Sequence, residues 1–105
     1  GNEQLAKRLN GQEVYVSFIT ELQLMGFTQI SDSEIRVIQA FLASCTIVDI
    51  NEPIKRFTIA LKQQHRIKLP DAIIAATARH LNIPLLTADK GFRRITEIEL
   101  NLFEV

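Results

Sequence analysis

Strand-like and helix-like segments alternate along this chain of 105 residues. Short runs rich in β-branched and aromatic residues predict strands at 13–17, 46–50, 84–88 and 101–105. Between them, apolar residues spaced by three and four predict helices. Such alternation is typical of an α/β fold with a mainly parallel sheet, and a chain of this length builds one hydrophobic core. We therefore predict a single domain over residues 1–105.

Capping residues indicate where the predicted helices begin. Ser31 followed by Glu34 forms the S-x-x-E capping box, while Ser17 and Asn51 can cap the helices that follow the first two strands. A later helix contains the run 72–78 (AIIAATA), which is small or apolar nearly all round. A helix of that composition is normally buried.

The formal net charge is zero, but the charges are unevenly distributed. Residues 52–94 hold nine basic and three acidic side chains, so this segment carries a net charge of +6. It could offer a basic face to an anionic polymer, or it could simply be a solvated amphipathic helix. Charge alone leaves both interpretations open.

The sequence also bears on the location of the protein. Cys45 is the only cysteine, so no intrachain disulfide forms, and residues 1–8 (GNEQLAKR) lack the apolar core of a signal peptide. No apolar run approaches the roughly 18 residues that a membrane span needs. We therefore expect a cytoplasmic protein that has no contact with a membrane.

Three acidic residues are predicted to meet at one edge of the sheet. Function gathers at the carboxyl ends of parallel strands, and connecting helices run antiparallel to those strands. Glu21 lies early in the helix after strand 13–17, and Asp89 directly follows strand 84–88. Asp71 begins the helix that leads into strand 84–88, which places it at the same edge.

Three carboxylates within a few ångström need a compensating cation. Mg²⁺ or Mn²⁺ is the usual one, and either ion can activate water for attack on a phosphodiester. This chemistry predicts a hydrolase in which Glu21, Asp71 and Asp89 bind the metal. Thr87 precedes Asp89 by two residues, so its hydroxyl can hydrogen-bond a carboxylate or a metal-bound water.

Each of these residues also has a purely structural interpretation. Asp71 can stabilise the dipole of its helix, Asp89 can cap a turn, and Glu21 can be an ordinary exposed helix residue. Thr87 can pack in the core. Spacing alone leaves the metal site and the structural interpretation about equally supported.

Two segments resemble a known family. Residues 68–95 (KLPDAIIAATARHLNIPLLTADKGFRRI) contain the patterns L-P-D-A-x-I-A-A-x-A and L-x-T-x-D-x-x-F, and residues 17–26 (SFITELQLMG) match a helix that carries an acidic Glu. Together they resemble the PIN domain, as found in bacterial VapC-type toxins. With the segments between them, the resemblance covers essentially the whole chain.

The resemblance implies a three-layer α/β domain, with helices flanking a mainly parallel sheet, and the activity of a Mg²⁺- or Mn²⁺-dependent endoribonuclease. It assigns the metal-binding acids to Glu21, Asp71 and Asp89, the adjacent hydroxyl to Thr87, and a packing aromatic to Phe92. The implied partners are RNA, a cognate antitoxin that inserts a peptide into the acidic groove, and a second copy of the chain.

One family feature is missing. PIN domains start with a strand that ends in Asp, whereas here Asn2 already falls where the first helix should be under way. That strand is central in the family's 3-2-1-4-5 order, so strands 13–17 and 84–88 are left with unpaired edges. We expect one of three outcomes: these strands close onto each other, a second chain donates or exchanges a strand, or the sequence is a fragment of a longer, N-terminally extended product.

The missing strand also removes one metal-binding acid. This leaves an alternative function, a catalytically incompetent PIN-like module that binds antitoxin or RNA without cleavage. A phosphoryl-accepting signalling domain has less support, because no predicted strand ends in paired acids.

Overall fold

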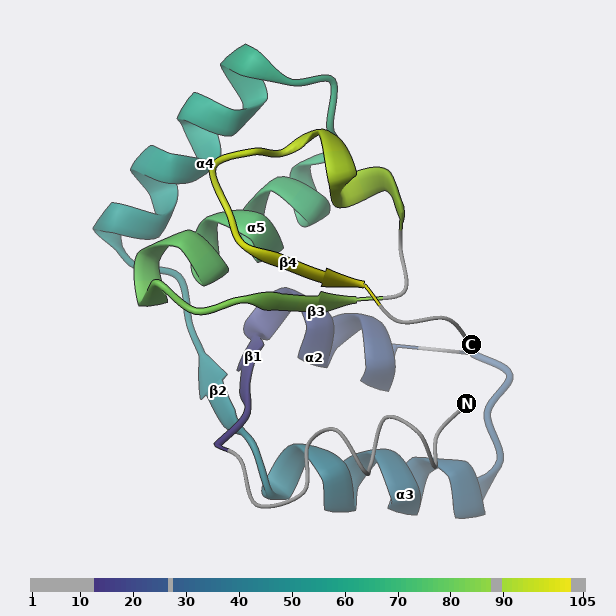
Figure 1. Cartoon of the computed structure of the whole chain (residues 1–105). Helices are drawn as coiled ribbons and strands as arrows, with labels where there is room; N and C mark the ends of the chain where they lie inside the picture. The colour runs from purple at the N-terminus through teal and green to yellow at the C-terminus, as the bar shows by residue number, and fades with distance from the viewer. Residues whose placement is uncertain (1–12, 27, 88–89, 103–105) are drawn as a thin grey trace. The chain divides into compact units, whose positions relative to one another are not determined.

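The computed structural model describes residues 13–26, 28–87 and 90–102 (Figure 1). The chain divides into two compact units, residues 1–49 and 50–105. Strands and helices alternate, which confirms the predicted α/β class. The elements in chain order are β1 (Tyr15–Ser17), α2 (Phe18–Met25), α3 (Asp32–Ala43), β2 (Thr46–Val48), α4 (Glu52–Gln64), α5 (Leu69–Leu81), β3 (Leu85–Thr87), the 3₁₀ helix η1 (Lys90–Arg94) and β4 (Leu100–Leu102).

The four strands form two parallel pairs, each within one unit. β1 pairs with β2, with Tyr15 opposite Thr46, and β3 pairs with β4, with Leu85 opposite Leu100. In the order 3-2-1-4-5 these pairs correspond to the neighbours 3-2 and 4-5. Among the described strands β1 and β3 each have one hydrogen-bonded neighbour, and the three expected outcomes for their open edges stay predictions.

The predicted caps are present in the first unit. The Ser17 side chain accepts a hydrogen bond from the backbone N–H of Ile19 at 3.2 Å, which starts α2 directly after β1. At the start of α3, Ser31 Oγ accepts from the Glu34 N–H at 3.2 Å, and the Glu34 carboxylate accepts from the Ser31 N–H at 3.3 Å. Both ends of this capping box are therefore satisfied.

The second unit is built on the packing of α5 against α4 (Figure 1). On α4, Ile54 and Leu61 are buried, with exposed fractions of 0% and 3%. On α5, three alanines at helical spacing, Ala72, Ala75 and Ala76, are fully buried. Small side chains on this face allow close helix packing, and the prediction of a buried helix here is confirmed.

A second contact joins the start of α4 to the end of α5. Asn51 Oδ1 accepts from the Ile54 N–H at 2.9 Å, and this cap turns the amide Nδ2 toward His80 Nε2 at 3.3 Å. Because Asn51 Oδ1 already accepts at the helix cap, the amide Nδ2 is the atom that faces His80 Nε2. The two helices are thus also held by a polar contact.

Glu97 ties the segment before β4 to both helices. His65, which follows α4, donates from Nε2 to the Glu97 carboxylate at 3.0 Å, and Arg79 of α5 donates to the Glu97 carbonyl at 3.2 Å. Arg79 also lies over the Phe57 ring, 5.6 Å from its centre. Partial burial raises the pKa of Glu97, but hydrogen bonds from His65 and Thr96 outweigh this effect, and the net pKa is lowered.

None of the helices in the described part of the chain has the length and apolar character that a membrane span requires.

Truncating Ile54 tests the α4–α5 core. The Ile54→Ala variant is expected to lower the free energy of unfolding by about 2 to 5 kcal/mol, because it leaves a cavity at a fully buried position. Ile59, on the same helix, is 57% exposed, and its replacement by Ala should change stability by less than about 0.5 kcal/mol. Urea unfolding followed by circular dichroism measures both, and equal effects would refute the assigned core.

The Glu97 contacts predict a pH dependence of stability. A carboxyl whose pKa is lowered by folding stabilises the protein above its unfolded pKa, near 4.5, and loses this contribution as the pH falls through the folded value. The Tm difference between the wild type and Glu97→Gln should therefore be largest near neutral pH and shrink below pH 4.5. Glu99→Gln, in the same segment, serves as the control for the effect of the substitution itself. A difference that grows on acidification would contradict the contact.

Candidate functional site

Asp71 lies in the first turn of α5, in the second unit. Lys68 is the N-cap residue of this helix but makes no side-chain cap, and Pro70 occupies the first turn, where its missing N–H costs nothing. The buried alanine face of α5 fixes the helix against α4 and so fixes the position of Asp71. The carboxylate is partly exposed at the positive end of the helix dipole.

The 3₁₀ helix η1 forms the opposite wall of the site. Phe92 and Ile95 are 5% and 2% exposed, so they anchor this short segment in the core. The neighbouring Arg93 and Arg94 are exposed. Burial of Phe92 agrees with the packing role that the sequence assigned to it.

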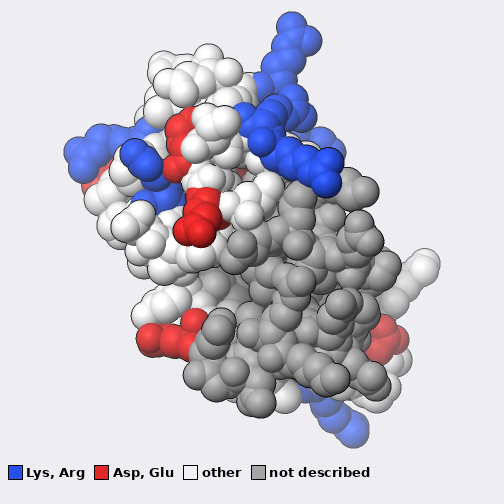
Figure 2. All heavy atoms as spheres, in the orientation of Figure 1, with Lys and Arg blue, Asp and Glu red and all other residues white. Residues whose placement is uncertain are grey.

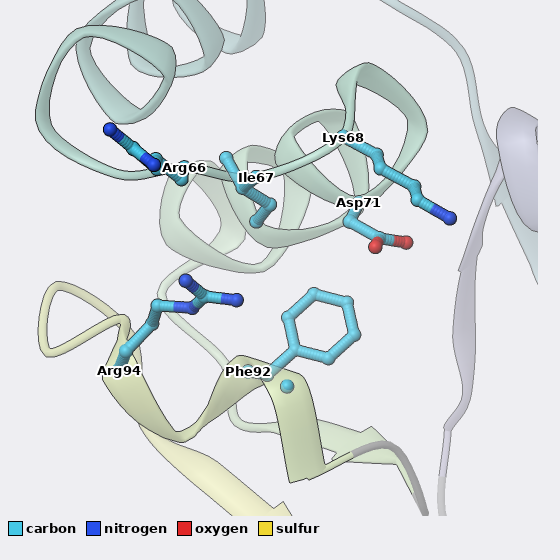
Figure 3. A pocket seen from close by; sticks show the side chains of 7 residues that line it. Arg66, Ile67, Lys68, Asp71, Phe92 and Arg94 are labelled. Carbon is cyan, nitrogen blue, oxygen red and sulfur yellow. The ribbon is translucent and has the colours of Figure 1, made fainter.

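Between these elements lies a cavity of about 180 Å³ (Figure 3). Figure 3 shows the Asp71 carboxylate beside the Phe92 ring, and the Arg94 guanidinium directed into the space between Phe92 and Ile67. Arg66 and Lys68 extend in opposite directions from the loop before α5. The lining residues are Arg66, Ile67, Lys68, Asp71, Gly91, Phe92 and Arg94. Three cationic side chains and one carboxylate thus line the same cavity.

The charges around this cavity have no partners among the residues that the structure describes. Within the part of the chain that the structure describes, the side chains of Asp71, Arg66, Lys68 and Arg94 make no hydrogen bond or ion pair, and the ion pair formed elsewhere joins His65 to Glu97. The loop itself is held by Lys62, whose Nζ donates to the Ile67 carbonyl at 2.7 Å. The site is therefore ordered by neighbouring contacts while its own charges stay available to a ligand.

The structure does not bring the other predicted site residues, Glu21, Thr87 and Asp89, together with Asp71 in one described site. Glu21 lies in the first turn of α2, as expected, but in the first unit. Thr87 ends β3, with its side chain outside the description, and Asp89 lies outside the described residues. Considering only residues 13–26, 28–87 and 90–102, no three His, Cys, Asp or Glu side chains form a group that could hold a metal. The three-acid site therefore stays a prediction.

The sequence did not predict which basic side chains line the cavity. The surplus of basic residues in 52–94 indicated the right segment, and Figure 2 shows Lys and Arg side chains at several places on one face, with Asp and Glu among them. Which of these cations line the cavity follows only from the turn of η1 and the loop before α5. Arg94 lines it, whereas Arg93 does not.

Comparison with known proteins identifies the family. A sequence model described as "PIN domain" matches residues 1–98, which span both units. The comparison with curated proteins gave no match.

Solved structures agree with this match. A toxin-antitoxin complex from Klebsiella pneumoniae contains a chain 32% identical to this one, with a TM-score of 0.73, and the alignment covers 87% of this chain and 75% of that one. VapBC-1 from nontypeable Haemophilus influenzae matches at 28% identity and a TM-score of 0.73, covering 96% and 82%. VapBC2 from Rickettsia felis matches at 21% identity and a TM-score of 0.75, covering 97% and 84%. This chain is therefore a VapC-like member of the PIN domain family.

Proposed function

We propose that the chain is a Mg²⁺- or Mn²⁺-dependent endoribonuclease, the toxin of a toxin-antitoxin pair, and that the Asp71 cavity is part of its active site. The observation that carries this proposal is the cavity itself, which is lined by one carboxylate and three cations that have no partner among the described residues. A carboxylate can bind a metal ion, and the cations can bind the phosphates of a nucleic acid. A cytoplasmic location goes with this proposal, because the RNA substrate is there.

The proposed metal ligands are Glu21, Asp71 and Asp89, with the Thr87 hydroxyl beside them. Asp71 fits this role on geometry, because its carboxylate faces a cavity and is not neutralised by a neighbouring cation. A bound Mg²⁺ or Mn²⁺ would supply an activated water for phosphodiester hydrolysis. Arg66, Lys68 and Arg94 would hold the anionic substrate near these carboxylates.

An antitoxin is the proposed protein partner. The match from Klebsiella pneumoniae is a toxin-antitoxin complex, and those from Rickettsia felis and Haemophilus influenzae are VapBC proteins. The Rickettsia felis structure is described as bound to a DNA fragment from its promoter. These descriptions support an antitoxin-bound state for this chain as well.

Replacing Asp71 tests the nuclease. Asp71→Asn should lower metal-dependent RNA cleavage roughly 100-fold or more while the fold is retained, because a neutral amide is a poor Mg²⁺ ligand. Glu52→Gln is the matched control, since Glu52 also lies in the first turn of a helix that has proline there. Cleavage of labelled RNA is measured with Mg²⁺, with Mn²⁺ and with EDTA.

Three outcomes are distinguishable in this assay. Cleavage by the wild type that is lost in EDTA and in Asp71→Asn supports the proposal. Metal-dependent cleavage that survives Asp71→Asn contradicts the role of Asp71. Tight binding of RNA or antitoxin without any cleavage favours the catalytically incompetent module instead.

We also propose a homodimer in which a strand from a second copy covers the open edges of β1 and β3. Each of these strands has one hydrogen-bonded neighbour among the described strands, and an open edge readily accepts another strand. Light scattering after size-exclusion chromatography should give about twice the 11.9 kDa of one chain. A purely monomeric protein at micromolar concentration would contradict this assembly.

A further inference from the structure

We infer that the cavity beside Asp71 is a subsite for one backbone phosphate of RNA, with Arg94 as its central ligand and Arg66 and Lys68 on either side. The inference rests on the proposed nuclease function and specifies how the substrate is held. It also predicts that this subsite reads the backbone and not the base.

Electrostatics favours an anion in this cavity. Arg66, Lys68 and Arg94 line a space of about 180 Å³ together with one carboxylate, that of Asp71, so the lining carries a net positive charge. Within the described chain, none of these cations is neutralised by a protein carboxylate. A phosphate oxygen is the acceptor that a guanidinium fork binds best, and Arg94 directs its guanidinium into the cavity (Figure 3).

The apolar lining explains why the backbone, and not a base, is recognised. Proteins that hold bases of a single strand usually stack them on exposed aromatic rings. Phe92 is the aromatic residue that lines the cavity, and it is only 5% exposed, so it serves as a wall and offers no face for stacking. Binding here should therefore be independent of sequence and sensitive to salt.

Asp71 has an opposite effect on phosphate binding in the absence of metal. Its carboxylate faces the same cavity, so it repels a phosphate when no metal ion compensates its charge. The Asp71→Asn variant should therefore bind RNA more tightly than the wild type in EDTA. A carboxylate remote from the cavity would not produce this gain.

The test is the binding of a fluorescently labelled single-stranded oligouridylate, measured by anisotropy over a series of salt concentrations in EDTA. In the Asp71→Asn background, Arg94→Gln should weaken binding about tenfold and reduce the slope of log affinity against log salt by about 0.7. Arg93→Gln is the matched control, because Arg93 is its exposed neighbour outside the cavity. This control should bind like the parent, and oligoadenylate should show the same ratios.

Each alternative outcome has a defined meaning. Equal losses for Arg93→Gln and Arg94→Gln would overturn the subsite in favour of a diffuse basic surface. A loss that differs between oligouridylate and oligoadenylate would overturn backbone recognition. The same anisotropy measurement is made with a labelled acidic peptide. If Arg94→Gln lost binding to this peptide but kept RNA binding, the cavity would be assigned to a protein partner. Arg94-dependent RNA binding without metal-dependent cleavage would refute the nuclease and leave the subsite standing.

Discussion

The candidate site depends on the close packing of α5 against α4. Fully buried alanines on α5 let the helices approach, and Ile54 on α4 fills the contact. Because α5 begins at Leu69, this packing also fixes Asp71 at the mouth of the cavity. A core made from small residues thus sets the position of the group to which we assign the chemistry.

Electrostatics then determines what the site can do. Polar contacts join Glu97 to His65 and Arg79, and Asn51 to His80, whereas the charges of the cavity have no partner in the described part of the chain. Unpaired charge of both signs in one cavity suits a ligand that brings a cation and an anion together. A metal ion with a phosphodiester is such a ligand, and this agrees with membership of the PIN domain family.

Local signals in the sequence predicted much of the second unit. The Asn51 cap and the run 72–78 predicted α4 and α5, because caps and helical periodicity act over a few residues. β1 and β2 are shorter than predicted, since tertiary pairing determines where a ladder stops. The distinction between Arg93 and Arg94 depends on the turn of η1, which composition does not reveal. The meeting of Glu21, Asp71 and Asp89 is a long-range prediction that rests on sheet topology.

The position of a bound metal ion tests the central claim most directly. Crystals grown with Mn²⁺ and measured at a wavelength where manganese scatters anomalously would locate the ion without reference to activity. We predict an anomalous peak within about 2.5 Å of an Asp71 carboxylate oxygen, with Glu21 and Asp89 as further ligands. A manganese ion bound elsewhere, with Asp71 free of metal, would contradict the account.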